Sequence, residues 1–418
     1  MSVATDSGAP AIVAQPASQA VALGASVTLT VSASGAGTLA YQWRHDGVAI
    51  AGATAVSYTL AAARAFDAGN YDVVVTNMTG AATSAAATLA VTAAGSAAPH
   101  SLAAYMAALA FYNTLAPHQQ GILQLTWSVD AARRGLSLPD TMVARNGLAL
   151  GSLNPAQQAA AAALVKTALG DTGSSLQRGV QAADDYLAAN GGGNLYGGGQ
   201  YHVAFLGTPS PTGFWMLQLS GRHATWNLAF NGRGDAPTPV FVGIEPAAAF
   251  TLDGVAYDPL LVQRSAMAAL GAALVHYPAA QLPGSVPGLL FAADGAGNID
   301  GTCPRADDTV TTHGVLYSRL SASDQALAQT VIRAWIGTQA AKRANALLGT
   351  YLSSQALAQT YVAYAGTGTV DRVGNYLRIE GPRLWLAWSV QRSAINAGDV
   401  QYQALWRDKF ADDGGRCA

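Results

Sequence analysis

The sequence predicts two folded units, an N-terminal all-β sandwich over residues 9–93 and a large α+β domain over residues 101–418. Short strands in which apolar and hydroxylated residues alternate fill the first unit, which is typical of half-buried strands. In the second unit, blocks of helical periodicity alternate with blocks of strands, so we expect an antiparallel sheet with flanking helices. Residues 94–100 are mostly Ala, Gly, Ser and Pro and form the predicted linker.

The first unit carries the marks of one particular sandwich. Its strands are predicted at residues 27–31, 41–43, 58–60, 73–75 and 87–91. Trp43 lies where a core tryptophan belongs, and Asp67-Ala68-Gly69-Asn70-Tyr71 has the pattern of a tyrosine corner. The segment therefore resembles a bacterial immunoglobulin-like domain. Val31 and Val73 occupy the positions of the usual inter-sheet cysteines, so the resemblance implies a sandwich held by packing alone.

The second unit begins with helices. Asn154-Pro155-Ala156-Gln157 combines an N-cap, a first-turn proline and a capping glutamine, which marks a helix start. Helices are predicted at residues 101–115, 117–134, 154–169, 176–189, 259–275 and 321–352. Strands are predicted at residues 201–206, 214–219, 223–230, 240–243, 376–380, 384–390 and 400–407.

Charge and composition exclude several classes of function. Only 11% of residues are charged and the net charge is −2, which gives no electrostatic basis for nucleic-acid binding. No run of about 18 apolar residues is present, so we expect no membrane span. The first residues lack the pattern of a signal peptide, yet the low lysine content favours a secreted or periplasmic bacterial protein. Cys303 and Cys417 are either a disulfide or two separate thiols, and both readings stay open.

Familiar catalytic motifs are missing from the sequence. The glycine runs at residues 191–193 and 197–199 precede strands and lack a Lys-Ser/Thr ending, so they are turns and not phosphate loops. The acidic stretch at residues 294–300 lacks the final glutamate of a calcium loop. Neither a Gly-x-Ser-x-Gly elbow nor a His-Glu-x-x-His helix occurs.

Two polar segments remain as candidates for a site, residues 215–227 and 401–413. Strand alternation puts Gln401, Gln403 and Arg407 on one face of one strand, and His223 with Thr225 and Asn227 on one face of another. If the strands adjoin, an imidazole, amides, a guanidinium and carboxylates converge. His223 suits proton transfer near neutral pH, and the Arg407-Asp408 pair suits an anion anchor. The alternative is an internal polar network that ties the sheet to its helices.

At several separated motifs the large domain resembles the family called domain of unknown function 3500. The resemblance runs over residues 115–415 and includes Gly221-Arg222-His223, residues 238–246, residues 376–385 and Trp406-Arg407-Asp408-Lys409. The family pattern has Gly-His-His at residues 221–223 and His-x-His at residues 401–403.

Four imidazoles on two neighbouring strands are typical of a metal site. In this chain Arg222, Gln401 and Gln403 replace three of them. The resemblance therefore implies that this member binds such a metal weakly or has no cofactor at all.

Three hypotheses for the function follow. The first is a secreted, hydrolase-like enzyme acting on a small-molecule or polymeric extracellular substrate, with the small domain as a spacer or adhesion module. In that reading His223 is the acid/base, Asp408 orients Arg407 or Arg222, and Gln401 and Gln403 contact substrate. The aromatic walls of the cleft would be Trp215, Trp226 and Trp406. The second hypothesis is a non-catalytic extracellular binding or cell-surface protein, and the third is a metal-dependent oxidoreductase.

Overall fold

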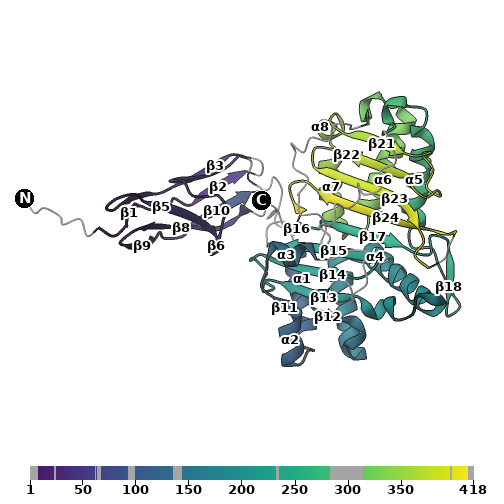
Figure 1. Cartoon of the computed structure of the whole chain (residues 1–418), viewed down its shortest axis with the longest axis horizontal. Coiled ribbons are helices and arrows are strands. Elements are labelled where there is room, and N and C mark those ends of the chain that lie inside the picture. Colours follow the sequence, from purple (N-terminus) through teal and green to yellow (C-terminus); the bar gives the residue numbers. More distant parts are fainter. Residues whose placement is uncertain are drawn as a thin grey trace, which may run out of the picture. The chain divides into compact units, whose positions relative to one another are not determined.

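The computed structural model describes residues 8–22, 25–61, 63, 67–92, 99–134, 144–231, 235–282, 314–395 and 398–412. Contacts divide the chain into a small unit that ends at Ala98 and a large unit that begins at Pro99. Each unit is shown in Figure 1 and is described by itself below.

The small unit is strand-rich throughout. One sheet has the order β2-β10-β8-β5-β6, with β9 paired to β8, while β3 pairs with β7 and β1 with β4. The strands are β1 (Ala11–Ala14), β2 (Gln19–Ala22), β3 (Val27–Thr30), β4 (Ser32–Ser34), β5 (Ala40–His45), β6 (Val48–Ala49), β7 (Ser57–Leu60), β8 (Gly69–Asn77), β9 (Gly80–Thr83) and β10 (Ala87–Thr92).

The core of the small unit confirms the immunoglobulin-like prediction. Trp43 is fully buried, and its indole N–H donates to the Ala55 carbonyl over 3.0 Å. The Tyr71 hydroxyl donates to the Asp67 carbonyl over 2.8 Å, which is the hydrogen bond of a tyrosine corner. Val31 and Val73 both lie in the core cluster around Trp43. Apolar packing therefore fills the place where a disulfide would cross between the sheets.

The large unit is an α+β domain, as predicted. Its principal helices are α1 (Pro99–Tyr112), α2 (Pro117–Leu123), α3 (Val129–Arg133), α4 (Pro155–Leu187), α5 (Leu261–Leu274), α6 (Ala322–Ile336), α7 (Ala341–Tyr351) and α8 (Ser354–Leu357). None of the helices in the described ranges is long and apolar enough to cross a membrane. Helix α4 has a kink at Gly170, whose φ of 80° is a left-handed conformation that favours glycine.

Twelve of the described strands form one sheet. Its order is β11-β13-β14-β15-β17-β24-β23-β22-β21-β20, and β12 pairs with β13 while β16 pairs with β15. These strands are β11 (Gln124–Leu125), β12 (Leu148–Ala149), β13 (His202–Leu206), β14 (Trp215–Ser220), β15 (Ala224–Phe230), β16 (Asp235–Ala236), β17 (Val240–Ile244), β20 (Val315–Leu316), β21 (Tyr361–Ala365), β22 (Tyr376–Glu380), β23 (Leu384–Arg392) and β24 (Val400–Asp408). A separate hairpin joins β18 (Phe250–Leu252) to β19 (Val255–Tyr257).

Several elements differ from the sequence prediction, among them the helix expected at residues 321–352, which forms two helices, α6 and α7. The single helix expected at residues 117–134 is wrong, because Gln124 and Leu125 leave the helical conformation to pair in parallel with β13. The helices expected at residues 154–169 and 176–189 form one kinked helix, α4. Strand β21 was not predicted as a strand, although it is paired on both sides, between β22 and β20.

The large domain contains the same arrangement twice. Each copy contains a glycine with positive φ, Gly147 or Gly314. At both positions a Cβ would lie within 2.4 Å of a carbonyl oxygen of the neighbouring strand. A short strand follows, β12 or β20, then one 3-10 turn and a helix capped by Asn154 or Ser321. The Leu150 amide donates to the Tyr201 carbonyl over 2.7 Å, and the Tyr317 amide donates to the Thr360 carbonyl over the same distance.

The correspondence extends along the sheet. Gln124 pairs in parallel with Phe205 in the first copy, and Gln281 pairs in parallel with Tyr364 in the second. The hairpin β14–β15 corresponds to β22–β23: the Gly221 amide donates to the Ala224 carbonyl and the Gly381 amide to the Leu384 carbonyl, both over 2.8 Å. We call the first copy, residues 99–244, the first half, and the second, residues 261–408, the second half.

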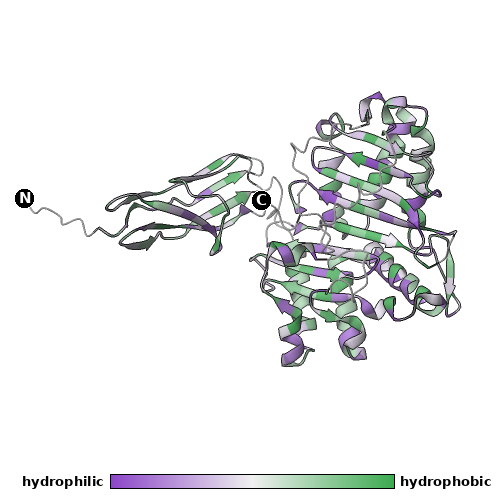
Figure 2. Ribbon diagram, viewed as in Figure 1, coloured by the Kyte–Doolittle hydropathy of each residue, from purple (hydrophilic) through white to green (hydrophobic). Residues whose placement is uncertain are grey.

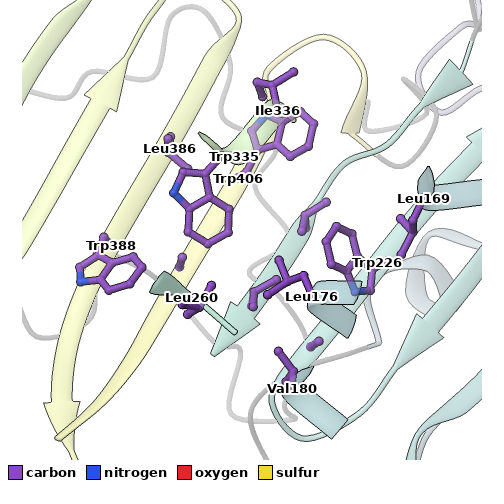
Figure 3. Packing of buried hydrophobic residues seen from close by; sticks show 14 of the residues in the cluster. Leu169, Leu176, Val180, Trp226, Leu260, Trp335, Ile336, Leu386, Trp388 and Trp406 are labelled. Atoms are coloured by element: carbon purple, nitrogen blue, oxygen red, sulfur yellow. The ribbon is translucent and has the colours of Figure 1, made fainter. Parts of the chain in front are cut away.

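The two halves meet at the antiparallel pair of β17 and β24, where Val242 lies opposite Ala404. Strands of the first half are blue to teal and those of the second half green to yellow in Figure 1. One apolar cluster joins both halves on one face of the sheet, and Figure 3 shows part of it, from Trp226 with Leu176 of α4 to Trp388 with Trp335 of α6. The strands also carry hydrophilic residues, coloured purple in Figure 2.

Candidate functional site

The predicted acid/base His223 lies in a buried cluster of charged side chains. It is 1% exposed, and its Nδ1 is 2.5 Å from Oδ1 of Asp184 on α4. On its other side, Nε2 is 4.0 Å from Oε2 of Glu245, which follows β17. Glu245 is fixed through Oε1, which accepts from the Ser393 hydroxyl and from the Ala394 amide. Two carboxylates therefore flank one imidazole, and each is bound to another part of the chain.

Aromatic and cationic groups surround this cluster. The Tyr201 hydroxyl donates to Oδ2 of Asp184 over 2.8 Å. The Arg222 guanidinium lies over the Tyr196 ring, with 4.1 Å between the guanidinium carbon and the ring centroid. Burial raises the pKa of Tyr196 against the opposing effect of the Arg222 charge. Since His223, Asp184 and Glu245 are each at most 1% exposed, the cluster ties α4 to the sheet and presents no acid or base to solvent.

The convergence of His223 with Gln401 and Gln403 stays a prediction: a Cβ on Gly243, which pairs with Gln403, would lie 3.3 Å from the His223 ring, but neither glutamine is hydrogen-bonded to the imidazole. Tyr402, Ala404 and Trp406 belong to the apolar cluster on the helix-covered face, so alternation turns Gln401 and Gln403 to the opposite face. There the Gln403 carbonyl oxygen accepts from Gln391 over 2.8 Å, and the Gln401 amide donates to the Arg392 carbonyl. His223 contacts Asp184 on α4, and its ring lies next to Gly243, on the side of β17 to which Gln403 of the paired strand also points.

The sequence neighbours Arg407 and Asp408 hydrogen-bond to different partners. Arg407 Nε donates to Asp412 over 2.5 Å, whereas Asp408 accepts from Arg383 and Tyr351. Burial raises the pKa of Asp412 despite the nearby Arg407 charge. The two neighbours on β24 thus point to opposite faces and serve different networks. The alternative interpretation, a polar network inside the fold, describes both of them.

The three tryptophans expected to line a cleft are all in the core. Trp215, Trp226 and Trp406 are each 0% exposed. Trp215 stacks on Phe230 with 4.7 Å between the ring centroids, and Figure 3 shows Trp226 beside Leu169 and Leu176. The sequence signal of alternating tryptophans marked buried strand faces and not an aromatic binding surface.

Some predicted features lie outside the described residues. They are Cys303, Cys417, Asp413 and the acidic stretch at residues 294–300, so the disulfide stays a prediction. Among the described residues no group of three His, Cys, Asp or Glu side chains is placed to hold a metal ion.

Sequence reasoning missed the residues that build the cluster around His223. Asp184 is one of two adjacent carboxylates in a long, charge-poor helix, and this was the available signal. Glu245 appeared only within the motif at residues 238–246 and received no role. The partners come from elements far apart in the sequence, α4 and the end of β17, so no local pattern links them.

A pocket of about 300 Å³ lies in the bend of α4, away from the predicted site. The part of α4 before the Gly170 kink contributes three lining residues, Ala161, Ala162 and Val165. The part after the kink contributes five, which are Ser174, Gln177, Arg178, Gln181 and Asp185. Leu150, Gly151, Gly198, Gly199, Gln158 and Leu219 complete the wall. Gly151 and Gly199 approach so closely that a Cβ on Gly151 would lie 3.1 Å from the Gly199 carbonyl oxygen. We call this cavity the α4 pocket.

One polar group in the α4 pocket lacks a protein partner. Gln177 is 2% exposed, and its Oε1 accepts from the Trp226 indole N–H over 2.7 Å. This bond fixes the amide orientation, so Nε2 is the donor end, and no described residue accepts from it. Leaving a buried donor unpaired costs about 1–3 kcal/mol, so such a group is expected to meet water or a ligand.

The second half shows why the first half has this pocket. Counted from the helix caps, Leu150 corresponds to Tyr317 and Ala162 corresponds to Gln329. In the second half the Gln329 amide donates to the Tyr317 hydroxyl over 2.7 Å, and Tyr317 is 7% exposed. A hydrogen-bonded pair of large side chains therefore fills the equivalent space. Two smaller residues keep it open in the first half.

The sequence of the large domain matches the family model described as "Protein of unknown function (DUF3500)" over residues 100–415. The chain belongs to this family. The match covers both halves and the α4 pocket, so the duplicated sheet is the architecture of this DUF3500 domain. No curated protein matches the chain.

The small unit matches an immunoglobulin domain model over residues 9–77. A chimeric titin Z1Z2 functionalized with a KLER peptide from decorin is 31% identical, covering 20% of this chain and 95% of that chain with a TM-score of 0.19. Sidekick-1 immunoglobulin domains 1–5 are 26% identical, covering 20% of this chain and 18% of that chain, also with a TM-score of 0.19. The tandem Ig repeats of Dlar are 23% identical and cover 20% and 48% of the two chains, again with a TM-score of 0.19.

We expect the DUF3500 domain to lose stability in alkali. Burial and then Asp184 hold the pKa of Tyr201 well above its ordinary value of 10.0, and burial and then Asp408 do the same for Tyr351. In the unfolded chain both phenols ionise near pH 10, whereas in the folded domain they stay protonated. Stability is therefore complete below about pH 10 and falls above it by about 1.4 kcal/mol per pH unit for each tyrosine.

Urea unfolding between about pH 9 and pH 11 measures this loss. Tyr201→Phe should flatten the slope by the contribution of one phenol. A free energy of unfolding that stays constant over this range would contradict the prediction.

Proposed function

We propose that the large domain is a non-catalytic binding domain that takes a small molecule into the α4 pocket. The observation that carries the proposal is the buried, unpaired Nε2 of Gln177 in a cavity of about 300 Å³. A largely apolar wall with a few fixed polar groups is the usual composition of a ligand site, and this volume falls at the lower end of its usual range. The ligand is therefore a compact molecule with an apolar body and one hydrogen-bond acceptor, such as a ketone or an amide.

We further propose that the protein acts outside a bacterial cell, with the immunoglobulin-like domain as a spacer or adhesion module. The immunoglobulin-like fold and the low content of charged residues support this location. In this proposal, the small-molecule or polymeric substrate expected from the sequence is a ligand. The protein carries or recognises this ligand and does not convert it.

Ligand-observed NMR with acetophenone and cyclohexanone tests the proposal, with ethylbenzene as a probe of similar shape that lacks the acceptor. We expect the ketones to bind more tightly than ethylbenzene. Gln177→Glu retains the acceptor for Trp226 and removes the amide donor, so it should weaken ketone binding about tenfold or more and leave ethylbenzene unaffected.

Closing the pocket supplies the second arm of this test. The double change Leu150→Tyr with Ala162→Gln installs the hydrogen-bonded pair of the second half and should abolish binding of every probe. Its thermal unfolding should stay at or above that of the wild type, because the pair also fills a cavity. Ketone binding that survives in this variant would overturn the proposal.

Hydrolysis is the second candidate, and one observation favours it. The imidazole of His223 has an orienting carboxylate on Nδ1 and a second carboxylate facing Nε2, an arrangement suited to general base catalysis. All three groups are buried, so we rank hydrolysis below ligand binding as the proposed function. Turnover of a panel of p-nitrophenyl esters that disappears in His223→Gln would reverse this order.

A further inference from the structure

A second, smaller pocket lies in the second half. The corresponding place in the first half, around His223, is filled by side chains. The second pocket has a volume of about 170 Å³, and it lies between the end of α7, α8 and the turn that joins β22 to β23. Tyr351, Ser353, Gln355 and Arg383 are among the residues that line it. We call it the Arg383 pocket.

Arg383 is the positive group of this pocket and is held by Asp408. Its Nη2 donates to Oδ2 of Asp408 over 2.8 Å and its Nε donates to Oδ1 over 3.2 Å. Asp408 is 0% exposed and also accepts from the Tyr351 hydroxyl over 2.7 Å and from the Phe410 amide over 3.0 Å. The carboxylate is therefore fully used, and the guanidinium is fixed in one orientation.

The guanidinium retains donors that no described residue uses. Of its five N–H groups, two are committed to Asp408, and the remaining three include both on Nη1. The Arg383 side chain is 31% exposed, in contrast to 2% for the side chain of the corresponding His223. One edge of the guanidinium is thus fixed by the protein, while the other stays accessible at the pocket.

Comparison of the halves identifies the residue that opens the pocket. In the first half the Tyr201 ring lies against Gly221, within 2.4 Å of the position that a Cβ there would take. In the second half Thr360 holds the place of Tyr201, and its Oγ1 lies 3.0 Å from the corresponding position on Gly381. A phenol ring closes the site at His223, and the small threonine leaves the site at Arg383 open.

We propose that the Arg383 pocket binds a short-chain monocarboxylate. A free guanidinium edge matches a carboxylate with two parallel hydrogen bonds, and its planar fork is already oriented by Asp408. The volume admits an acid of the size of acetate or propionate. The side-chain amide of Gln355 lies in the same wall and adds a polar group beside the guanidinium.

Titration of the full chain with acetate and propionate, followed by calorimetry or NMR, tests the inference, with acetamide as the neutral isostere. We expect the acids to bind and acetamide to bind at least about tenfold more weakly. Thr360→Tyr introduces the ring that closes the first half and should abolish acid binding. Arg383→Lys retains the charge, loses the fork and should weaken binding about tenfold.

The control is Leu150→Tyr with Ala162→Gln, which closes the α4 pocket and should leave acetate binding unchanged. Thr360→Tyr should conversely leave ketone binding unchanged, so failure at one site is distinguishable from failure at the other. The inference is overturned if the wild type binds neither acid, or if acid binding is the same in Thr360→Tyr as in the wild type while that variant unfolds at the wild-type temperature.

Discussion

Replacing Asp184 with alanine is expected to destabilise the large domain by about 3–5 kcal/mol, because it leaves the buried imidazole and the Tyr201 hydroxyl without their acceptor. The carboxylate is 0% exposed, so water does not replace it without rearrangement of α4. Urea unfolding followed by tryptophan fluorescence measures the loss, since Trp226 lies in the core next to α4.

Asp185→Ala is the matched control for this change. Asp185 is the next residue of the same helix, is exposed, and its Oδ1 accepts from the Gly198 amide over 2.7 Å. Its removal should cost no more than about 1 kcal/mol, the usual contribution of one hydrogen bond. Equal effects of the two substitutions would show that the cluster around His223 adds nothing to the stability of the fold.

Trp43→Ala is expected to unfold the immunoglobulin-like domain. Removal of a fully buried tryptophan costs about 3–5 kcal/mol, and a domain of this size has little stability to spare. Val31 and Val73 stand where cysteines would otherwise join the sheets, so no cross-link compensates. Calorimetry should show the transition of the small domain lost or strongly lowered and that of the large domain unchanged.

Val48→Ala serves as the comparison, because Val48 is 55% exposed and contributes little to the core. A shift of both transitions together in Trp43→Ala would mean that the two domains unfold as one unit, contrary to their separate cores.

The small domain was predictable because its signals are local. Trp43 marks the core of the sandwich, and its indole N–H is hydrogen-bonded to the Ala55 carbonyl. The segment from Asp67 to Tyr71 marks the tyrosine corner, and the expected hydrogen bond between these two residues forms. In the large domain most helices and strands also follow local periodicity. What failed was the helix expected across Gln124, where parallel pairing with β13 overrides helical propensity.

The place of His223 in the candidate site depends on the turn before β15. His223 was counted as the first residue of a strand, on one face with Thr225 and Asn227. It lies instead in a turn closed by the hydrogen bond from the Gly221 amide to the Ala224 carbonyl, and β15 begins only at Ala224. Strand alternation therefore does not determine its side-chain direction, and the ring reaches both Asp184 on α4 and the space next to Gly243, on the face of Gln403. Both pockets depend on pairs of residues far apart in the sequence, which single-strand patterns do not reveal.

The seam between β17 and β24 has a consequence for how the large domain folds. Separated from its counterpart, either half would end in a strand with a full row of unpaired amides and carbonyls, a template for association with any other chain. We therefore expect an isolated half to associate through this edge, although each half repeats the other. During synthesis we expect the edge of the first half to stay unpaired until β24, the last of the described strands, emerges and closes it.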